Sequence, residues 1–171
     1  MRGTFANVRI LNKMADGKEG GFTKLMPDGK ILPIFDACQE YAKRKTSLIL
    51  FAGKDYGMGS SRDWAAKGTL LLGVRAVVAQ SFERIHRSNL IGMGVLPLRF
   101  CEKESWQSLG IKGDETFSLM GLEKLTPRQE VMLDISHQKK IKLISCLETL
   151  TEIEYYQHGG IMPYVLRDVM S

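Results

Sequence analysis

The sequence predicts an α/β fold with short strands and flanking helices. The middle third leads to this class, because apolar runs typical of buried strands alternate there with amphipathic segments typical of helices. The composition agrees, since 44% of the 171 residues are apolar and 25% are charged, a globular balance that excludes disordered and fibrous classes. A chain of this length suits one domain, so residues 1–171 are expected to form a single domain.

The first third is expected to hold a strand, a hairpin and a helix. Residues 5–11 alternate loosely between apolar and polar side chains and predict a strand. Residues 25–32 predict a hairpin around a Pro-Asp-Gly turn. Pro33 then opens a helix, and the basic trio at 43–45 is expected to end it, because cations are favourable at a helix C-terminus. This position favours a cap over a nucleic-acid patch.

The rest of the chain continues the alternation of strands and helices. Residues 48–52 form a short, fully apolar run and predict a buried strand. The further predicted elements are strands at 74–79, 95–98, 117–120, 131–135 and 141–147, and helices at 82–93 and 160–170. The last helix carries an apolar stripe of Ile161, Val165, Leu166 and Val169.

The charge of the chain is uneven. The net charge is +5, but residues 1–100 carry +8 and the remainder −3, and a basic front half suits nucleic acid or small anionic substrates. No run of about 18 apolar residues could span a membrane, and the N-terminus is charged where a signal peptide is apolar. The three widely spaced cysteines, Cys38, Cys101 and Cys146, fit a reducing cytoplasm rather than a disulfide framework.

The most unusual stretch is the glycine-rich loop of residues 53–68, GKDYGMGSSRDWAAKG. A helix is expected to begin near Ser60, because serine is a preferred N-cap and Asp63 suits a first helical turn. Arg62 stands where a dinucleotide fingerprint or a nucleophile elbow needs glycine, and no Gly-Lys-Ser/Thr follows for a phosphate loop. These three classes of site are therefore excluded.

What the loop offers is a site for an anion. Gly57 and Gly59 permit positive φ and close backbone approach, and we expect the loop backbone to require both. Free N–H groups at the helix start, the hydroxyls of Ser60 and Ser61, and the planar guanidinium of Arg62 suit a carboxylate or a phosphate.

Structural alternatives stay open for this region. A serine could cap the helix while Arg62 pairs with Asp55 or Asp63. A catalytic triad of Ser60 with His86 is a further alternative, although a histidine on a helix is more often a structural hydrogen-bonder. Tyr56 and Trp64 flank the loop, and packing is their expected role. No metal site is expected in this chain, because no Cys-x-x-Cys occurs and the histidines are isolated.

Residues 56–100, YGMGSSRDWAAKGTLLLGVRAVVAQSFERIHRSNLIGMGVLPLRF, resemble the C-terminal swivelling domain of the aconitase family. The opening RGTFANVRILNK and the ending YYQHGGIMPYVLRDVM resemble the same domain, in the branch that includes bacterial aconitase A and the cytosolic iron-regulatory protein. The resemblance implies a swivelling β/β/α domain. It implies an aconitate hydratase of the tricarboxylic acid cycle, a hydro-lyase that interconverts citrate and isocitrate through cis-aconitate.

The resemblance also implies roles for the loop residues. It implies that Ser60 is the catalytic base and that Ser61 and Arg62 bind a substrate carboxylate. The family's [4Fe–4S] cluster is held by cysteines in upstream domains, and the three cysteines of this chain do not match those positions. The cofactor is therefore expected in a full-length enzyme and not on this chain. We expect the chain to be a fragment or small subunit that is inactive alone, with a tricarboxylate substrate and upstream aconitase domains as its partners.

Other functions remain compatible with the sequence. Related hydro-lyases are 2-methylisocitrate dehydratase, homoaconitase and the isopropylmalate isomerase small subunit. A second class is an RNA-binding protein of the iron-regulatory type, which the basic front half permits, although no motif with stacking aromatics is present. A third is an inert packing domain.

Overall fold

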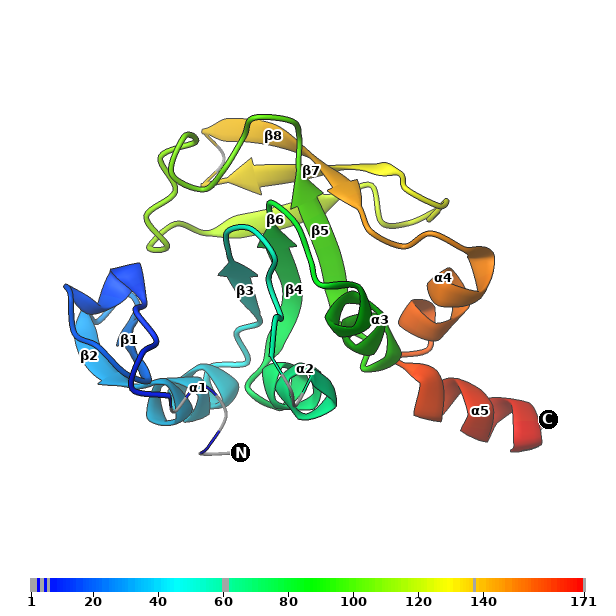
Figure 1. The fold of residues 1–171 in the computed structure, drawn as a ribbon, viewed down its shortest axis with the longest axis horizontal. Coiled ribbons are helices and arrows are strands. Elements are labelled where there is room, and N and C mark those ends of the chain that lie inside the picture. The colour runs from blue at the N-terminus through cyan, green and yellow to red at the C-terminus, as the bar shows by residue number, and fades with distance from the viewer. Residues whose placement is uncertain (1–2, 4, 6, 60–61, 137, 171) are drawn as a thin grey trace.

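A six-stranded sheet with the strand order β3-β4-β5-β8-β7-β6 organises the chain (Figure 1). The computed structural model describes residues 3, 5, 7–59, 62–136 and 138–170. The parallel half of the sheet contains β3 (Leu48–Phe51), β4 (Val74–Ala79) and β5 (Leu96–Phe100). The antiparallel half contains β6 (Phe117–Met120), β7 (Glu130–Ile135) and β8 (Lys139–Ser145). The predicted α/β class is confirmed, and strands 74–79 and 117–120 have the predicted bounds.

The N-terminal part is a small unit beside β3. It contains the 3₁₀ turn η1 (Lys13–Ala15), the antiparallel hairpin of β1 (Phe22–Leu25) and β2 (Lys30–Pro33), and helix α1 (Ile34–Lys43). The predicted hairpin and helix are confirmed. Helix α1 ends at the basic trio, where Arg44 is the C-cap and pairs with Asp28 at 2.8 Å.

The prediction of a strand at residues 5–11 is wrong. Among the described residues of this segment, the backbone is paired into no sheet, because the chain turns at Asn7. The Asn7 side chain accepts a hydrogen bond from the backbone N–H of Arg9 at 2.9 Å, and its carbonyl accepts one from Ile10 at 3.1 Å. Such local side-chain bonding competes with extended structure.

Two helices connect the parallel strands and cover one face of them. These are α2 (Arg62–Leu71), between β3 and β4, and α3 (Arg84–Gly92), between β4 and β5. Ala66 of α2 and Leu90 of α3 pack with Val77 of β4 in a buried cluster. Helix α3 begins two residues later than predicted, since Glu83 is its N-cap and accepts a hydrogen bond from the backbone N–H of His86 at 3.0 Å.

The main core lies on the other face of β4 and β5, against the antiparallel half of the sheet. Val78 and Leu98 meet Val131, Leu133 and Leu143 there. The chain ends in α4 (Leu150–Gln157) and α5 (Ile161–Met170), of which only α5 was predicted. Helix α4 had a readable signal, because Thr149 caps it by accepting a hydrogen bond from the N–H of Glu152 three residues later. No helix in the described residues is both long and apolar enough to cross a bilayer.

Candidate functional site

The glycine-rich loop lies at the carboxyl edge of the parallel strands, the edge at which open α/β sheets bind ligands. It leaves β3 after Phe51 and leads into α2, while the neighbouring turn of residues 80–83 leaves β4 and leads into α3 (Figure 1). Because β3 and β4 are parallel, the two connections start side by side. The fold therefore brings a long polar loop and a short turn together at one place.

Main-chain hydrogen bonds join the glycine-rich loop to this turn. Tyr56 donates its N–H to the carbonyl of Ser81 at 3.0 Å, and its own carbonyl accepts the N–H of Glu83 at 2.9 Å. Tyr56 and Phe82 form a parallel bridge beyond the ends of the strands. The pairing prolongs the contact between β3 and β4 and fixes the first part of the loop.

Asp55 and Ser81 reinforce this attachment through their side chains. The Ser81 hydroxyl accepts the backbone N–H of Asp55 at 2.7 Å and donates to Oδ1 of Asp55 at 3.0 Å. Asp55 has a φ of +51°, a left-handed conformation that aspartate tolerates better than most residues. The sequence suggested Arg62 as a partner of Asp55, whereas the structure pairs Asp55 with Ser81. The Asp-x-Gly pattern at 55–57 was the signal for a tight turn.

Gly57 is the position at which the loop requires glycine. Its φ is +93°, and a Cβ atom added there would overlap the ring of His86. Any larger residue would therefore be strained and would also push the loop away from α3. Gly59 shows neither feature, because its φ lies outside the positive region and no atom of the described residues would lie within 4 Å of a Cβ there. The steric argument made from the sequence applies to Gly57 and not to Gly59.

The other predicted site residues lie at the edge of what the structure describes. Ser60 and Ser61 fall outside the described residues. Of Arg62 the backbone is described, as the first residue of α2, with Asp63 in the first turn. The expected start of a helix near Ser60 is thus confirmed, whereas the roles of Ser60, Ser61 and Arg62 stay predictions.

The residues around the loop divide into a buried set and an exposed one. His86 is 1% exposed, and its ring meets the ring of Tyr56 edge to face at 5.3 Å. Burial raises the pKa of the Tyr56 hydroxyl to about 12, so Tyr56 stays protonated near neutral pH. Both buried side chains pack against the glycine-rich loop. Trp64 was expected to pack, but it is 67% exposed, with Lys67 placed over its ring.

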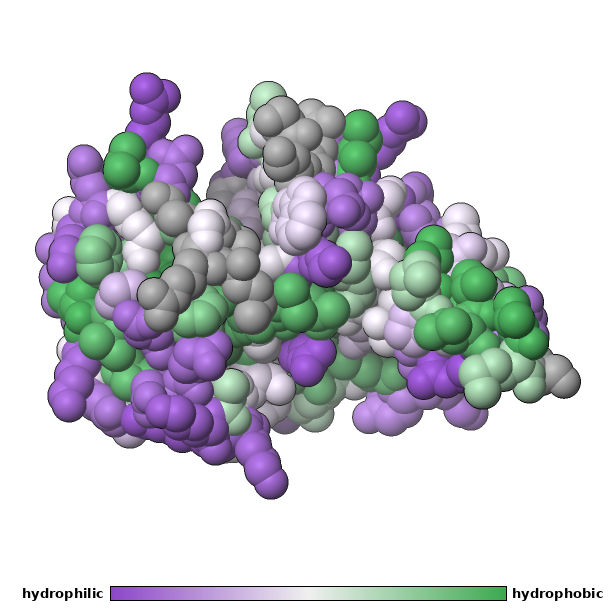
Figure 2. Space-filling view, turned by 90° about the horizontal axis from the view of Figure 1, so that it is seen from below, coloured by the Kyte–Doolittle hydropathy of each residue, from purple (hydrophilic) through white to green (hydrophobic). Residues whose placement is uncertain are grey.

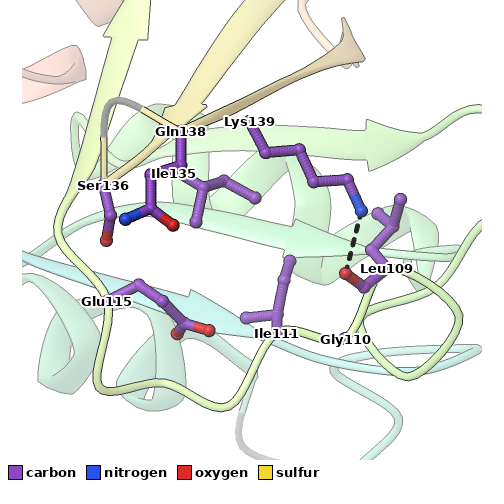
Figure 3. A pocket seen from close by; sticks show the side chains of 8 residues that line it. All are labelled: Leu109, Gly110, Ile111, Glu115, Ile135, Ser136, Gln138 and Lys139. Carbon is purple, nitrogen blue, oxygen red and sulfur yellow. Dashed lines mark hydrogen bonds between the residues drawn. The ribbon is translucent and has the colours of Figure 1, made fainter.

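Two hollows lie near the sheet, and the larger reaches Gly53 and Tyr56 at the start of the glycine-rich loop. The larger is about 1210 Å³ and separates the N-terminal unit from the sheet, with mostly apolar walls that include Tyr41, Phe51 and Trp106. The smaller is about 190 Å³ and lies beside the β7–β8 turn (Figure 3). Its charged groups form hydrogen bonds within the protein. Glu115 accepts two backbone N–H groups, and Lys139 donates to the carbonyl of Leu109 at 3.0 Å.

The residues of this chain do not fit an iron–sulfur cluster. The three cysteines lie apart, in α1, after β5 and after β8, and burial raises the pKa of Cys38 and of Cys146 to about 11. Iron is ligated by the thiolate form, which a raised pKa disfavours. Within the described residues, no three histidine, cysteine or acidic side chains gather in a way that could hold a metal ion.

Comparison with known proteins gives consistent results. The family model described as the aconitase C-terminal domain matches residues 1–103. Aconitate hydratase A of Bradyrhizobium diazoefficiens is 56% identical over 100% of this chain and 20% of its own length. The proteins of the same name from Deinococcus radiodurans and Bacillus subtilis are 53% and 51% identical over 99% and 100% of this chain, each over 19% of its own length. The chain spans about a fifth of the length of the curated relatives it matches.

A solved structure shares the fold. The 3-isopropylmalate dehydratase of Methanocaldococcus jannaschii superimposes with a TM-score of 0.56 and 26% sequence identity. The match covers 79% of this chain and 74% of that one.

Proposed function

Because the chain belongs to the aconitase C-terminal domain family, we propose that it is the part of an aconitate hydratase that binds the tricarboxylate and supplies the catalytic base. The reaction proposed is the interconversion of citrate and isocitrate through cis-aconitate. The relatives named aconitate hydratase A cited above are 51–56% identical to the chain over the aligned segment, against 26% for the 3-isopropylmalate dehydratase. This difference favours aconitate hydratase over the related hydro-lyases.

The observation that carries the proposal is the fixed path of the glycine-rich loop. The Tyr56–Phe82 bridge and the Asp55–Ser81 pair hold its first part, and α2 begins at Arg62 where it ends. A helix N-terminus offers free N–H donors and a partial positive charge, both of which favour a carboxylate. The held first part of the loop and the start of α2 thus support a place for an anionic substrate between them.

In the proposed mechanism each loop residue has one task. Ser60 takes a proton from the substrate carbon, with Oγ as the acceptor. A serine hydroxyl is a poor base unless positive charge and N–H donors stabilise its alkoxide, and the start of α2 and Arg62 would provide both. Ser61 and the guanidinium fork of Arg62 bind a carboxylate and stabilise the negative charge that develops on it as the proton leaves.

The proposal assigns a limited part of the enzyme to this chain. Since its own residues do not fit an iron–sulfur cluster, that cofactor would belong to another part of the longer polypeptide. The chain alone is expected to be inactive. The cytoplasm remains the expected location, on the ground of three thiols that form no disulfide. RNA binding stays a prediction, which a gel-shift titration over a salt series would test.

The test uses a chimaera in which this chain replaces the matching segment of the Bradyrhizobium diazoefficiens relative. Ser60→Ala should lower kcat by about 10²–10⁴-fold with little change in KM, the effect of losing a general base. Arg62→Lys keeps the charge but loses the fork, so it should raise KM and also lower kcat. Ser118→Ala, at an exposed serine on β6, is the matched control.

Iron content must be equal in all variants, because loss of the cofactor would imitate either defect. A Ser60→Ala chimaera with near wild-type kcat would contradict the proposal. Ser60 would then be a helix cap, with Ser61 the next candidate for the base.

A further inference from the structure

Helix α5 presents an apolar face to solvent. Among its side chains, six apolar ones are 40% to 85% exposed: Ile161, Met162, Val165, Leu166, Val169 and Met170. None of the ten residues of this helix is buried, all of them being described. Figure 2 shows the result as an apolar patch at the end of the molecule that α5 forms. The sequence predicted this stripe, but in the structure no described element covers it.

The other side of α5 fixes its orientation. The ring of Tyr164 contacts the rings of Tyr155 and His158 at centroid distances of 5.1 and 5.3 Å. Arg167 donates Nη1–H to the carbonyl of His158 at 2.9 Å. These contacts come from the side of the helix opposite the apolar stripe, so the stripe cannot turn inward without breaking them.

Glycines hold the start of α5 close to the body of the protein. A Cβ atom at Gly160 would lie 2.6 Å from the carbonyl oxygen of Gly92, and one at Gly94 would lie 2.6 Å from the carbonyl group of Gly159. The turn before α5 therefore rests directly on the turn between α3 and β5. The outward face of α5 is a consequence of this packing and not of a loosely attached end.

We infer that this apolar face is the surface on which the remaining part of the aconitase polypeptide packs. The inference rests on the proposed function, because it requires a longer enzyme of which this chain is one part. Relatives that match the chain from end to end are about five times as long. A contiguous exposed apolar patch of this kind marks a protein contact, and residues at i, i+4 and i+8 along α5 form a flat strip that suits another apolar surface.

The size of the face favours this partner over a second copy of the chain. A ten-residue helix is about 15 Å long, and one side of it is smaller than the roughly 800 Å² per partner typical of stable complexes. Such a face alone is too small for a stable dimer. Within one polypeptide, the covalent connection gives an effective concentration of about millimolar, so a small apolar face is sufficient.

The test measures how accessible this face is, without turnover or substrate. Val169→Cys is placed in the 171-residue chain and in the chimaera, and maleimide labelling is followed by peptide mass spectrometry. The label should enter position 169 at least 10-fold more slowly in the chimaera than in the chain. Met120→Cys, at an exposed position of β6, a strand remote from α5 in Figure 1, should label at the same rate in both.

A second variant separates the surface from the fold. Leu166→Glu should leave the thermal unfolding of the 171-residue chain unchanged, lower the Tm of the chimaera and restore fast labelling at position 169 of its Val169→Cys form. Equal labelling rates at position 169 in the chain and the chimaera would overturn the inference. So would labelling of the chain that slows as its concentration rises, because the occupant would then be a second copy. Since labelling needs no activity, failure of the catalytic proposal and failure of this one are distinguishable.

Discussion

The two halves of the sheet bury their strands differently. In the parallel half, β4 is buried along nearly its whole length, between α2 and α3 on one face and the main core on the other. In the antiparallel half, β8 alternates, with Lys140 and Lys142 exposed and Ile141 and Leu143 buried. The parallel strands end in the connections that form the candidate site, whereas β7 returns to β8 through a short turn. Burial on both faces fixes β4, from which the turn of residues 80–83 leaves, whereas β3, the edge strand from which the glycine-rich loop leaves, is only partly buried.

The halves are joined by more than the pairing of β5 with β8. Arg87 of α3 donates to the carbonyl of Cys146 at 2.6 Å and to both carboxylate oxygens of Glu152 at 2.9 and 3.1 Å. This largely buried pair links the helix layer of the parallel half to the segment that follows β8. Substitutions can test the core, this link and the loop of the candidate site one at a time.

The largest effect is expected in the core of the antiparallel half. Leu143→Ala should lower the free energy of unfolding by about 2–5 kcal/mol, because Leu143 is fully buried between Phe100 and Val131 on the neighbouring strands. Lys142→Ala, next to it on the exposed face, should cost less than about 1 kcal/mol, since it removes a surface pair with Glu130. Urea denaturation of the chain measures both. Equal losses of stability in the two variants would contradict the burial of only one face of β8.

The second effect concerns the link between the halves. Arg87→Ala should cost about 2–3 kcal/mol, because it removes charged hydrogen bonds and leaves Glu152 without them. Chemical denaturation at neutral pH measures this loss. An Arg87→Ala chain as stable as wild type would show that this ion pair adds nothing to the joining of the halves by the β5–β8 pairing and the shared core.

The same link predicts a pH dependence. Burial would raise the pKa of Glu152, but hydrogen bonds from Arg87 and from the N–H of Glu148 outweigh it and hold the pKa below its ordinary value of 4.5. The stability that this group contributes is therefore present above pH 4.5 and is lost as the pH falls through the lower pKa of the folded state. Glu152→Gln should reduce the loss of stability at acidic pH, as measured by denaturation over a pH series. An unchanged pH dependence would contradict the role given to Glu152.

A smaller effect is expected in the parallel half at Gly57. Gly57→Ala should cost roughly 1–3 kcal/mol, the range for a residue forced into a sparsely populated backbone conformation, and the displaced loop should raise the KM of the chimaera. The physical reasons are the φ of +93° and the overlap with His86. Thermal unfolding and steady-state kinetics check the two parts. If KM does not change, the path of the loop at Gly57 does not position the substrate.

The smallest effect is expected two residues further on. Gly59→Ala should change the free energy of unfolding by less than about 0.5 kcal/mol, as for a surface substitution, because no atom of the described residues lies within 4 Å of a Cβ there. Measured beside Gly57→Ala, it is the matched control within one loop. A larger loss of stability at Gly59 than at Gly57 would mean that the described path of the loop is wrong.

Much of the fold was predictable from the sequence. The apolar run at 48–51 does form a strand, and the hairpin was marked by its Pro-Asp-Gly turn. The predicted burial of this strand is wrong, because β3 lies at the edge of the sheet and its residues are only partly buried. The strand predicted at 5–11 failed because Asn7 bonds its own neighbours, a local competition that a loose alternation conceals. Helix α4 was missed although Thr149 and Glu152 form a capping pattern. Element ends shifted by a residue or two where a cap decided them, as Glu83 did for α3.

The sequence alone predicted the α/β class and the position of the glycine-rich loop before a helix, which the structure confirms, and an anionic ligand for the loop, which stays a prediction. These depend on periodicity, on caps and on residue chemistry, all of which are local properties. The tertiary structure was needed to show that Gly57 and not Gly59 is sterically required, that Ser81 holds Asp55, and that the apolar stripe of α5 faces outward. The reason is that each of these depends on what lies opposite a residue, and residues opposite one another are far apart in the chain.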